Sequence, residues 1–424
     1  MKRTFTAHTL PLSTTKSRQW LGLPAGYAAL RHRNFRLYWF GQMISLAGTW
    51  MQTVAQGWLV YQLTRSPFAL GLVGMAASLP ILFFSLFGGV LADRLDRRKL
   101  LITTQSLAMF EAFIMAWLIW SGRIQIWQIY ALAFGLGMIY ALDSPARQAF
   151  VVELVGREDL PNAIALNATI FNLARVVGPA VAAALLATVG VASAYFINGL
   201  TFIAVIVMLI AIQVPARMTS ATQRSMLDNL REGLAYIRTD PPTMALIGMV
   251  AIVGLFGLPY STLMPAFADR ALHTGVQGYG ALLMASGIGA LISAFSLASL
   301  SSLRHKGKLL TVGDLIFPVM LVAFSLTRSM PLALGLLVLV GGFLVMRATI
   351  SNILLQTTVP DELRGRVMSV YTMMFLGMTP FGSFQAGVVA EHFGAPAAIL
   401  IGGLIVWSAA VFIFIRFPRV RRLP

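Results

Sequence analysis

Cysteine is absent from the 424 residues of this chain, and ionisable side chains are few. The lack of thiols excludes disulfides, thiolate metal ligands and cysteine nucleophiles. Only five histidines occur, and their spacings suggest no metal site, so we expect neither a metal nor a cofactor. Charged residues make up 11% of the chain, whereas about 25% is usual for a soluble domain. This scarcity excludes a soluble enzyme as the whole protein.

Catalytic signatures are missing as well. The chain has no Gly-x-Ser-x-Gly with a histidine partner, no His-Glu-x-x-His and no Walker loop. We therefore expect no enzyme activity and no direct use of ATP. The net charge of +17 could suggest a nucleic-acid binder, but Lys and Arg punctuate apolar runs instead of clustering. Nucleic acid is therefore not an expected partner.

Apolar residues dominate the chain, at 58% of the sequence with a mean hydropathy of +0.78. A helix that crosses ~30 Å of hydrocarbon at 1.5 Å per residue needs about 20 residues. Twelve runs are long enough, and the period-two alternation of a membrane barrel is absent. We predict an all-α membrane protein with twelve transmembrane helices. The predicted spans are residues 35–64, 68–91, 100–120, 126–151, 160–188, 193–213, 242–267, 278–300, 309–327, 331–358, 363–390 and 396–417.

The basic residues predict the orientation. Residues 1–34 are polar, basic and free of acids, and they lack the apolar core of a secretory signal, so they are interpreted as a cytoplasmic tail. An organelle transit peptide has a similar composition and is the alternative interpretation of these residues. Twelve spans would place most of the 32 basic residues on the side of the N-terminus. The loops of the other side hold only Arg65, Arg123, Arg270 and Arg328. We predict that both termini are cytoplasmic in a bacterial inner membrane.

The longest polar stretch, residues 214–241, separates two sets of six spans. Within it Met226, Leu227, Leu230, Leu234 and Ile237 recur at helical spacing, which predicts an amphipathic helix at the cytoplasmic surface. The halves are weakly similar, which favours a parallel repeat and two six-helix bundles with pseudo-two-fold symmetry. The predicted organisation is an N-terminal tail (1–34), a first bundle (35–213), a linker (214–241), a second bundle (242–417) and a C-terminal tail (418–424).

A short basic loop follows the second span. It reads Gly89-Val90-Leu91-Ala92-Asp93-Arg94-Leu95-Asp96-Arg97-Arg98. Taken alone, this loop fits two hypotheses. Either its cations only set the topology, or its acid also accepts hydrogen bonds from the N-terminus of another helix. The cations could pair with acids or with lipid phosphates, so membrane lipid is an expected partner.

This loop resembles the signature of the major facilitator superfamily. The matching residues are Gly89, Leu91, Ala92, Asp93, Arg94, Arg97 and Arg98, while Asp96 stands where a second glycine is usual. Residues 92–98, 145–147 and 362–367 resemble the branch that contains the enterobactin exporter and the macrolide efflux pumps. The resemblance extends over residues 35–417.

The resemblance implies two bundles that expose a central site alternately to each side of the membrane, with export driven by inward proton flow. It also implies a conformational gate, in which Asp93 clamps the two halves together near residues 361–366. The gate residues would be Gly89, Asp93, Arg94, Asp96, Arg97 and Arg98. The family's proton-coupling arginine of span four has no counterpart at 131–142, so the resemblance does not identify the coupling residue.

The fifth span carries Gly178 and Pro179 near its middle. Proline removes a backbone hydrogen bond and kinks a helix, and small neighbours such as Ala182 and Ala183 let another helix approach closely. The pair partly matches an element of the family's exporters. An ordinary kinked packing helix explains it equally well.

Five charged residues are candidates for a place within the hydrocarbon, where each costs at least roughly 2.5 kcal/mol unless it faces a cavity or a partner. They are Glu111, Asp143, Arg175, Asp314 and Arg347. The three acids are our candidates for proton coupling. Glu111 is favoured because no charge lies one helical turn away, whereas Asp143 could simply pair with Arg147 at i+4. Asp314 could snorkel towards the cytoplasm, and the two arginines could attract an anionic substrate or pair with Glu111 or Asp143.

The first span has a polar stripe at helical spacing, formed by Gln42, Ser45, Thr49, Gln52 and Gln56. Such a stripe faces either the interior of a bundle or a water-filled cavity. The resemblance implies a cavity lined by spans one, four, seven and ten. The candidate cavity residues are therefore Gln42, Ser45, Thr49, Gln52, Arg175, Tyr260, Arg347, Asn352 and Gln356.

Together these features predict a proton-coupled exporter of a bulky amphipathic small molecule, such as a siderophore or a drug, that works as a monomer. A metabolite or sugar porter of the same fold, or an importer, is an alternative. A non-transporting membrane receptor or assembly factor is another.

Overall fold

The computed structural model describes residues 25–213, 226–299 and 305–423, and every regular element within these ranges is a helix. Most of the predicted N-terminal tail, residues 1–24, lies outside the described residues, and residues Ala25–Arg31 form a short 3₁₀ helix, η1. The first half of the chain contains α1 (Arg33–Thr64), α2 (Pro67–Arg94), α3 (Arg97–Trp120), α4 (Ile126–Val155), α5 (Leu160–Thr188) and α6 (Val191–Ala211).

The second half begins with α7, which occupies part of the predicted linker, and ends in the short helix η4. Its elements are α7 (Met226–Thr239), α8 (Pro241–Ile252), η2 (Val253–Gly257), η3 (Leu258–Ser261), α9 (Met264–Arg270), α10 (Gly275–Ser299), α11 (Lys306–Leu326), α12 (Met330–Thr358), α13 (Asp361–Phe393), α14 (Ala395–Arg416) and η4 (Pro418–Arg422).

Eleven helical segments within the described ranges are long and apolar enough to cross a membrane. The first predicted span, α1, is not among them although it has 32 residues. The physical reason is its polar stripe, because Gln42, Gln52 and Gln56 lower the mean hydropathy of the helix. With α1 included, the helices account for the twelve predicted spans.

The seventh predicted span, 242–267, overlaps a membrane-capable helical segment, Pro241–Ser261, that is not one regular α-helix. α8 ends at Ile252, a π-helical turn covers Val253–Gly257, and a 3₁₀ turn leads to α9. Pro259 and Pro265 lack the N–H that a regular helix needs, and Gly254 and Gly257 weaken helical order.

The helix α7 packs against α13. A Cβ at Gly233 would lie 2.8 Å from the carbonyl oxygen of Arg366, and Glu232 pairs with Arg366. Ile237 is buried and Leu234 is 41% exposed, while the side chains of 226–230 and the whole of 214–225 lie outside the described residues. The amphipathic helix exists, and its place at a membrane surface stays a prediction.

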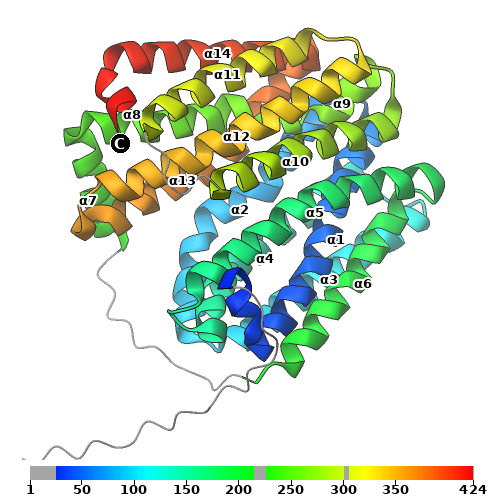
Figure 1. Cartoon of the computed structure of the whole chain (residues 1–424). Helices are drawn as coiled ribbons and strands as arrows, with labels where there is room; N and C mark the ends of the chain where they lie inside the picture. Colours follow the sequence, from blue (N-terminus) through cyan, green and yellow to red (C-terminus); the bar gives the residue numbers. More distant parts are fainter. Residues whose placement is uncertain (1–24, 214–225, 300–304, 424) are drawn as a thin grey trace, which may run out of the picture.

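The two halves meet along α2 with α13 and α5 with α10 (Figure 1). Small residues permit these contacts. A Cβ at Gly71 would lie 2.8 Å from Cα of Gly387, and one at Gly280 would lie 3.0 Å from the carbonyl oxygen of Pro179. Backbones this close leave no room for a larger side chain at either glycine.

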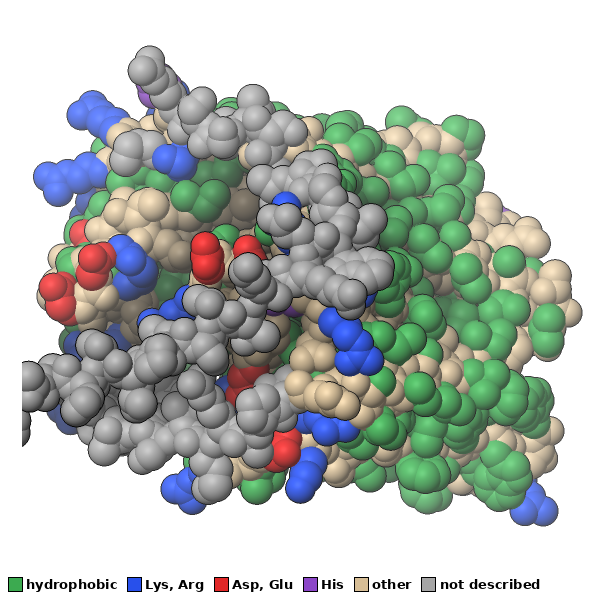
Figure 2. All heavy atoms as spheres, turned by 60° about the horizontal axis from the view of Figure 1, so that its bottom comes forward, with side chains coloured by type: hydrophobic (Ala, Val, Ile, Leu, Met, Phe, Trp, Pro, Cys, Tyr) green, Lys and Arg blue, Asp and Glu red, His purple; other side chains and the backbone are tan. Residues whose placement is uncertain are grey.

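One end of the bundle carries α7, η1 and η4, and we call it the linker end; the other is the far end. Figure 2 shows Lys, Arg, Asp and Glu side chains gathered mostly towards one side of the view, with hydrophobic side chains covering most of the rest. This distribution is typical of a bundle whose flanks lie in hydrocarbon.

Candidate functional site

Two adjoining cavities lie along the polar stripe of α1. The first, here called the charged cavity, has a volume of 520 Å³, and its lining includes Gln42, Ser45 and Thr49 of α1 with Asp143 and Arg147 of α4. The second, called the central cavity, has a volume of 270 Å³ and is lined by both halves. Its walls include Gln52 and Gln56 of α1 and Thr262 and Tyr279 of the second half. The cavities share Thr49 and Tyr140.

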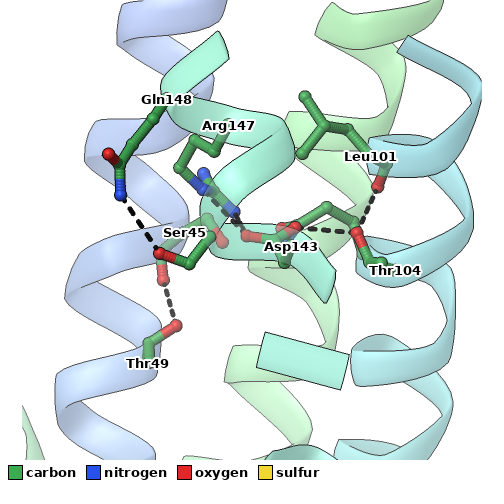
Figure 3. Close-up of polar contacts among 9 residues, drawn as sticks. Ser45, Thr49, Leu101, Thr104, Asp143, Arg147 and Gln148 are labelled. Atoms are coloured by element: carbon green, nitrogen blue, oxygen red, sulfur yellow. Dashed lines mark hydrogen bonds and ion pairs between the residues drawn. The ribbon is translucent and has the colours of Figure 1, made fainter. Parts of the chain in front are cut away.

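Asp143 is the centre of a buried polar network (Figure 3). Its Oδ1 accepts hydrogen bonds from Thr104 Oγ1 at 2.7 Å and from Gln105 Nε2 at 2.8 Å. Its Oδ2 accepts from Arg147 Nε at 2.8 Å. The i, i+4 pair foreseen in the sequence therefore forms, and it compensates the charge of both groups inside the bundle.

The charged cavity also contains polar atoms that no described protein donor satisfies. Gln105 Oε1 and Asn167 Oδ1 are buried without a hydrogen-bond partner among the described residues. Both residues line this cavity. Both oxygen atoms are buried in this structure, so neither is exposed to the open space of the cavity.

Glu111 of α3 lies behind the stripe instead of in a cavity wall. Its Oε2 accepts a hydrogen bond from Gln52 Nε2 at 2.9 Å, and Gln52 Oε1 accepts one from Asn198 Nδ2 at 2.5 Å. Glu111 is only 7% exposed. Because Gln52 lines the central cavity, it stands between that cavity and the Glu111 carboxyl.

Arg347 and Asp314 form an ion pair inside the second half. Arg347 Nε lies 2.5 Å from Asp314 Oδ1, and both side chains are 2% exposed. The expectation that Asp314 snorkels towards the cytoplasm was therefore wrong. Arg347 pairs with Asp314 on the neighbouring helix instead of with Glu111 or Asp143.

The remaining cavity candidates, Arg175, Tyr260, Asn352 and Gln356, line neither of these cavities, and neither does Arg347. Arg175 Nη2 lies 3.4 Å from Ser286 Oγ, and the guanidinium of Arg175 lies over the Trp50 ring. Ser286 Oγ is also 3.0 Å from the hydroxyl of Tyr260. Arg175 thus joins α5 of one half to α10 of the other. Gln356 donates to Asn352 Oδ1 within α12. Gly178, beside Pro179, packs against α1. A Cβ added at Gly178 would lie 2.4 Å from Trp50 Cβ.

The basic loop after α2 is organised around Arg97. Arg97 Nη1 lies 2.6 Å from Glu153 Oε1 of α4, and Nη2 lies 3.2 Å from Asp93 Oδ1. Arg98 donates to the carbonyl oxygens of Leu209 and Ile210 at the end of α6. The clamp of Asp93 on residues 361–366 stays a prediction.

The three further gate residues are Asp96, Gly89 and Arg94. Asp96 caps α3 by accepting a hydrogen bond from the Lys99 N–H at 3.1 Å, which explains an acid at this position. A Cβ at Gly89 would meet no atom within 4 Å, so this glycine makes no close contact in the described structure. Arg94 is exposed at the end of α2.

The sequence reasoning missed several of these groups. Thr104 and Gln105 hold Asp143, Asn198 holds Gln52, and Ser286 contacts Arg175. A signal existed on α3, because Thr104 precedes Glu111 by two helical turns on one face. No comparable pattern marks Asn198 or Ser286, which are single polar residues in apolar runs.

At the far end, polar contacts connect the halves. Arg65 Nη1 lies 2.8 Å from Asp269 Oδ2, which also accepts a hydrogen bond from the Tyr61 hydroxyl at 3.1 Å. Arg270 donates to the carbonyl oxygen of Arg65 at 2.5 Å. Glu391 of α13 accepts from Ser66 Oγ at 2.8 Å at the start of α2. We call Tyr61, Arg65, Asp269 and Arg270 the far-end latch.

Comparison with known proteins gives a consistent result. Residues 24–423 match the profile of a family described as "Transmembrane secretion effector". The chain is 28% identical to the multidrug efflux pump Tap of Mycolicibacterium fortuitum, over 91% of this chain and 95% of that protein. It is 25% identical to the staphyloferrin A transporter of Staphylococcus aureus, over 89% and 95% of the two chains. It is also 25% identical to the enterobactin exporter EntS of Escherichia coli, over 93% and 94%.

Solved structures share the fold. The nucleoside transporter NupG superposes with a TM-score of 0.72 at 12% identity, covering 91% of this chain and 99% of that one. A D-xylose-proton symporter superposes with a TM-score of 0.69 at 15% identity, covering 92% and 96%. At these identities the similarity concerns the arrangement of helices alone.

Proposed function

Because the chain belongs to the transmembrane secretion effector family of the major facilitator superfamily, we propose that it exports a bulky amphipathic small molecule in exchange for protons. The chain is an integral, multi-pass membrane protein whose relatives are transporters. Siderophores and drugs are the proposed substrates, since the names of the relatives include a siderophore transporter, a siderophore exporter and a multidrug efflux pump.

One observation carries the proposal. The charged cavity and the central cavity adjoin, and buried carboxyls lie in or directly behind their walls. A carboxyl that gains and loses a proton beside a substrate cavity can couple the two, because the ligand and the proton compete for the same charge. We propose Glu111 as the proton carrier, reached through Gln52, with Asp143 and Asp314 as the alternatives. Unlike these two, Glu111 has an amide, Gln52, as its described side-chain partner.

Substrate contacts are proposed along the cavity walls. Gln42, Ser45 and Thr49 would supply polar contacts, together with Gln105 and Asn167. Arg175 and Tyr260 are proposed to act at the contact between the halves. For Arg347 we favour a structural role, because its charge is compensated by Asp314.

The proposed cycle uses the two ends of the bundle in turn. The far-end latch would hold the cavities closed on one side, and the basic loop with Asp93 and Arg97 would close the other. We propose that the two halves move as the predicted bundles 35–213 and 242–417 and that 214–241 connects them. The linker end would face the cytoplasm of a bacterial cell, with both termini there, and a monomer would suffice.

The test uses purified protein in proteoliposomes with an imposed pH gradient and an internal pH dye. A catecholate siderophore, a macrolide and a cationic dye are added in turn to wild type and to Glu111→Gln. Substrate-dependent proton movement that the substitution abolishes is the expected result. Movement that survives would transfer the carrier role to Asp143 or Asp314. No movement with any compound would contradict proton-coupled export of this substrate class.

A porter of small metabolites, an importer and a receptor without transport remain the competing hypotheses. Uptake of the compounds in the same vesicles, in the direction opposite to export, would favour the importer. A receptor would tolerate simultaneous loss of Glu111, Asp143 and Asp93, whereas an exporter would lose flux.

A further inference from the structure

A third cavity, which we call the α2–α13 cavity, lies between helices of the two halves and has a volume of 560 Å³. Ile81 and Phe83 of α2 line one side, and Met368, Thr372 and Leu376 of α13 line the other. None of its lining residues carries a charge. The volume falls within the roughly 300–1,000 Å³ that is usual for small-molecule sites.

Of the three hydroxyl-bearing residues that line this cavity, Ser85, Ser369 and Thr372, the last two are bonded within their own helix. Ser369 Oγ donates to the carbonyl oxygen of Gly365 at 2.9 Å, and Thr372 Oγ1 donates to that of Met368 at 2.9 Å. The cavity therefore presents mainly apolar surface. Met368 and Met373 add flexible, polarisable side chains that adapt to ligands of different shape.

The α2–α13 cavity adjoins the charged cavity. Ile81 and Leu376 line both of them, so a single layer of side chains separates an apolar chamber from one that contains Asp143 and Arg147. Gln105 and Asn167 also line the charged cavity. Both chambers expose mainly apolar surface, but only the charged cavity has ionisable side chains in its lining, so the two together match a molecule that is largely apolar and carries one polar part.

The apolar lining also reaches the surface of the bundle. Phe83 is 57% exposed, Met373 is 43% exposed and Leu376 is 45% exposed. On the flank of a membrane protein such side chains face the hydrocarbon of the bilayer, so the open side of this cavity faces lipid. A lipid acyl chain could cover them, but it has no polar group for Asp143 and Arg147 in the adjoining cavity, which favours an amphipathic small molecule.

We infer that the α2–α13 cavity is an apolar subsite that receives the apolar part of an amphipathic small molecule while the polar part occupies the charged cavity. The inference rests on the proposed function, since it divides the proposed substrate site into two. Ile81 and Leu376 form the boundary and would separate when such a molecule binds.

The experiment fills the α2–α13 cavity with a large side chain. Thr372 is exposed and its hydroxyl serves only its own helix, so Thr372→Trp places an indole in the cavity at little cost to folding. The matched control is Thr103→Trp on α3, another exposed threonine near the linker end, whose hydroxyl bonds the carbonyl oxygen of Lys99. Equilibrium binding of a cationic rhodamine dye and of erythromycin is measured for the full-length chain in nanodiscs.

We expect Thr372→Trp to weaken binding of at least one probe tenfold or more, while Thr103→Trp binds within twofold of wild type. Equal affinities in the two variants, or no binding of either probe to wild type, would overturn the inference. In lipid-free detergent, displacement of the probe from wild type by about one phosphatidylethanolamine per protein would also overturn it, because the occupant would then be a lipid chain.

Proton movement in proteoliposomes separates the two proposals. Tenfold weaker binding in Thr372→Trp, with no proton movement in wild type, would leave the subsite standing and contradict proton-coupled export. Proton movement in wild type with unchanged binding in Thr372→Trp would leave export standing and remove the subsite.

Discussion

Arg347 and Asp314 form the most deeply buried ion pair among the described residues, with 2.5 Å between Arg347 Nε and Asp314 Oδ1. The two residues come from adjacent helices, α12 and α11, and both are almost inaccessible. A pair of this kind holds two helices in register, because either charge alone would be stranded in an apolar interior.

Loss of one partner should therefore cost more than loss of both. Arg347→Met leaves Asp314 uncompensated and should lower the free energy of unfolding by about 3–5 kcal/mol. The double variant Arg347→Met/Asp314→Leu should recover most of this loss, since no charge remains buried. Tryptophan-fluorescence melts of the purified proteins would measure both. A double variant as unstable as the single one would contradict a role in charge compensation.

The far-end latch should control conformation more than stability. The Arg65 side chain is 62% exposed, and pairs between exposed charges are worth at most about 1 kcal/mol. Asp269→Asn should thus leave the melting temperature nearly unchanged. It should change the ratio of the conformation with a closed far end to the conformation with an open far end by up to about fivefold. Distances between spin labels on Gln62→Cys and Gln277→Cys would report the shift.

The latch experiment has a built-in control. The chain has no natural cysteine, so both labels are unique. Arg123→Ala removes another exposed arginine from the far end, outside the latch, and should leave the distances unchanged. An unchanged distribution in Asp269→Asn would mean that the latch does not hold the halves together.

Gly88 and Gly89 are neighbours on α2 with opposite surroundings. A Cβ at Gly88 would lie 2.2 Å from the carbonyl oxygen of Ala141, whereas one at Gly89 would meet nothing within 4 Å. Gly88→Ala should force α2 and α4 apart and cost about 1–3 kcal/mol. Gly89→Ala should be neutral or stabilise by up to about 1 kcal/mol, because alanine is the better helix former. Similar melting temperatures for both variants would contradict this packing.

Gln52 should be needed for the orientation of Glu111. Gln52→Leu removes the hydrogen bond to the carboxyl and leaves both Glu111 and Asn198 without this partner, which should cost about 1–3 kcal/mol of stability. If Glu111 carries the proton, Gln52→Leu should also reduce substrate-dependent proton movement. Gln56→Leu, one turn further along the same stripe of the central cavity, is the matched control. Equal flux in the two variants would remove Gln52 from the coupling path.

The apolar pattern of the sequence by itself determined the helices. The fifth predicted span and α5 both cover 160–188, because a run of apolar residues between a polar start and a turn has few alternatives in hydrocarbon. The pair of Asp143 and Arg147 was also predictable, since i and i+4 meet on any helix. The polar stripe of α1 predicted either a bundle interior or a cavity wall, and the family resemblance favoured the wall; Gln42, Ser45, Thr49 and Gln52 do line cavities.

Only the tertiary structure decided which distant groups meet. Gln52 and Glu111 are 59 residues apart, and the partner of Arg347 depends on the rotation and depth of α11 against α12. Those variables are set by close packing at small residues such as Gly313 of α11, where an added Cβ would lie 2.9 Å from Met346 Cε and 3.3 Å from Arg347 Cβ of α12. The α2–α13 cavity has the same origin, because a cavity is the space that packing leaves, and no single segment of sequence encodes it.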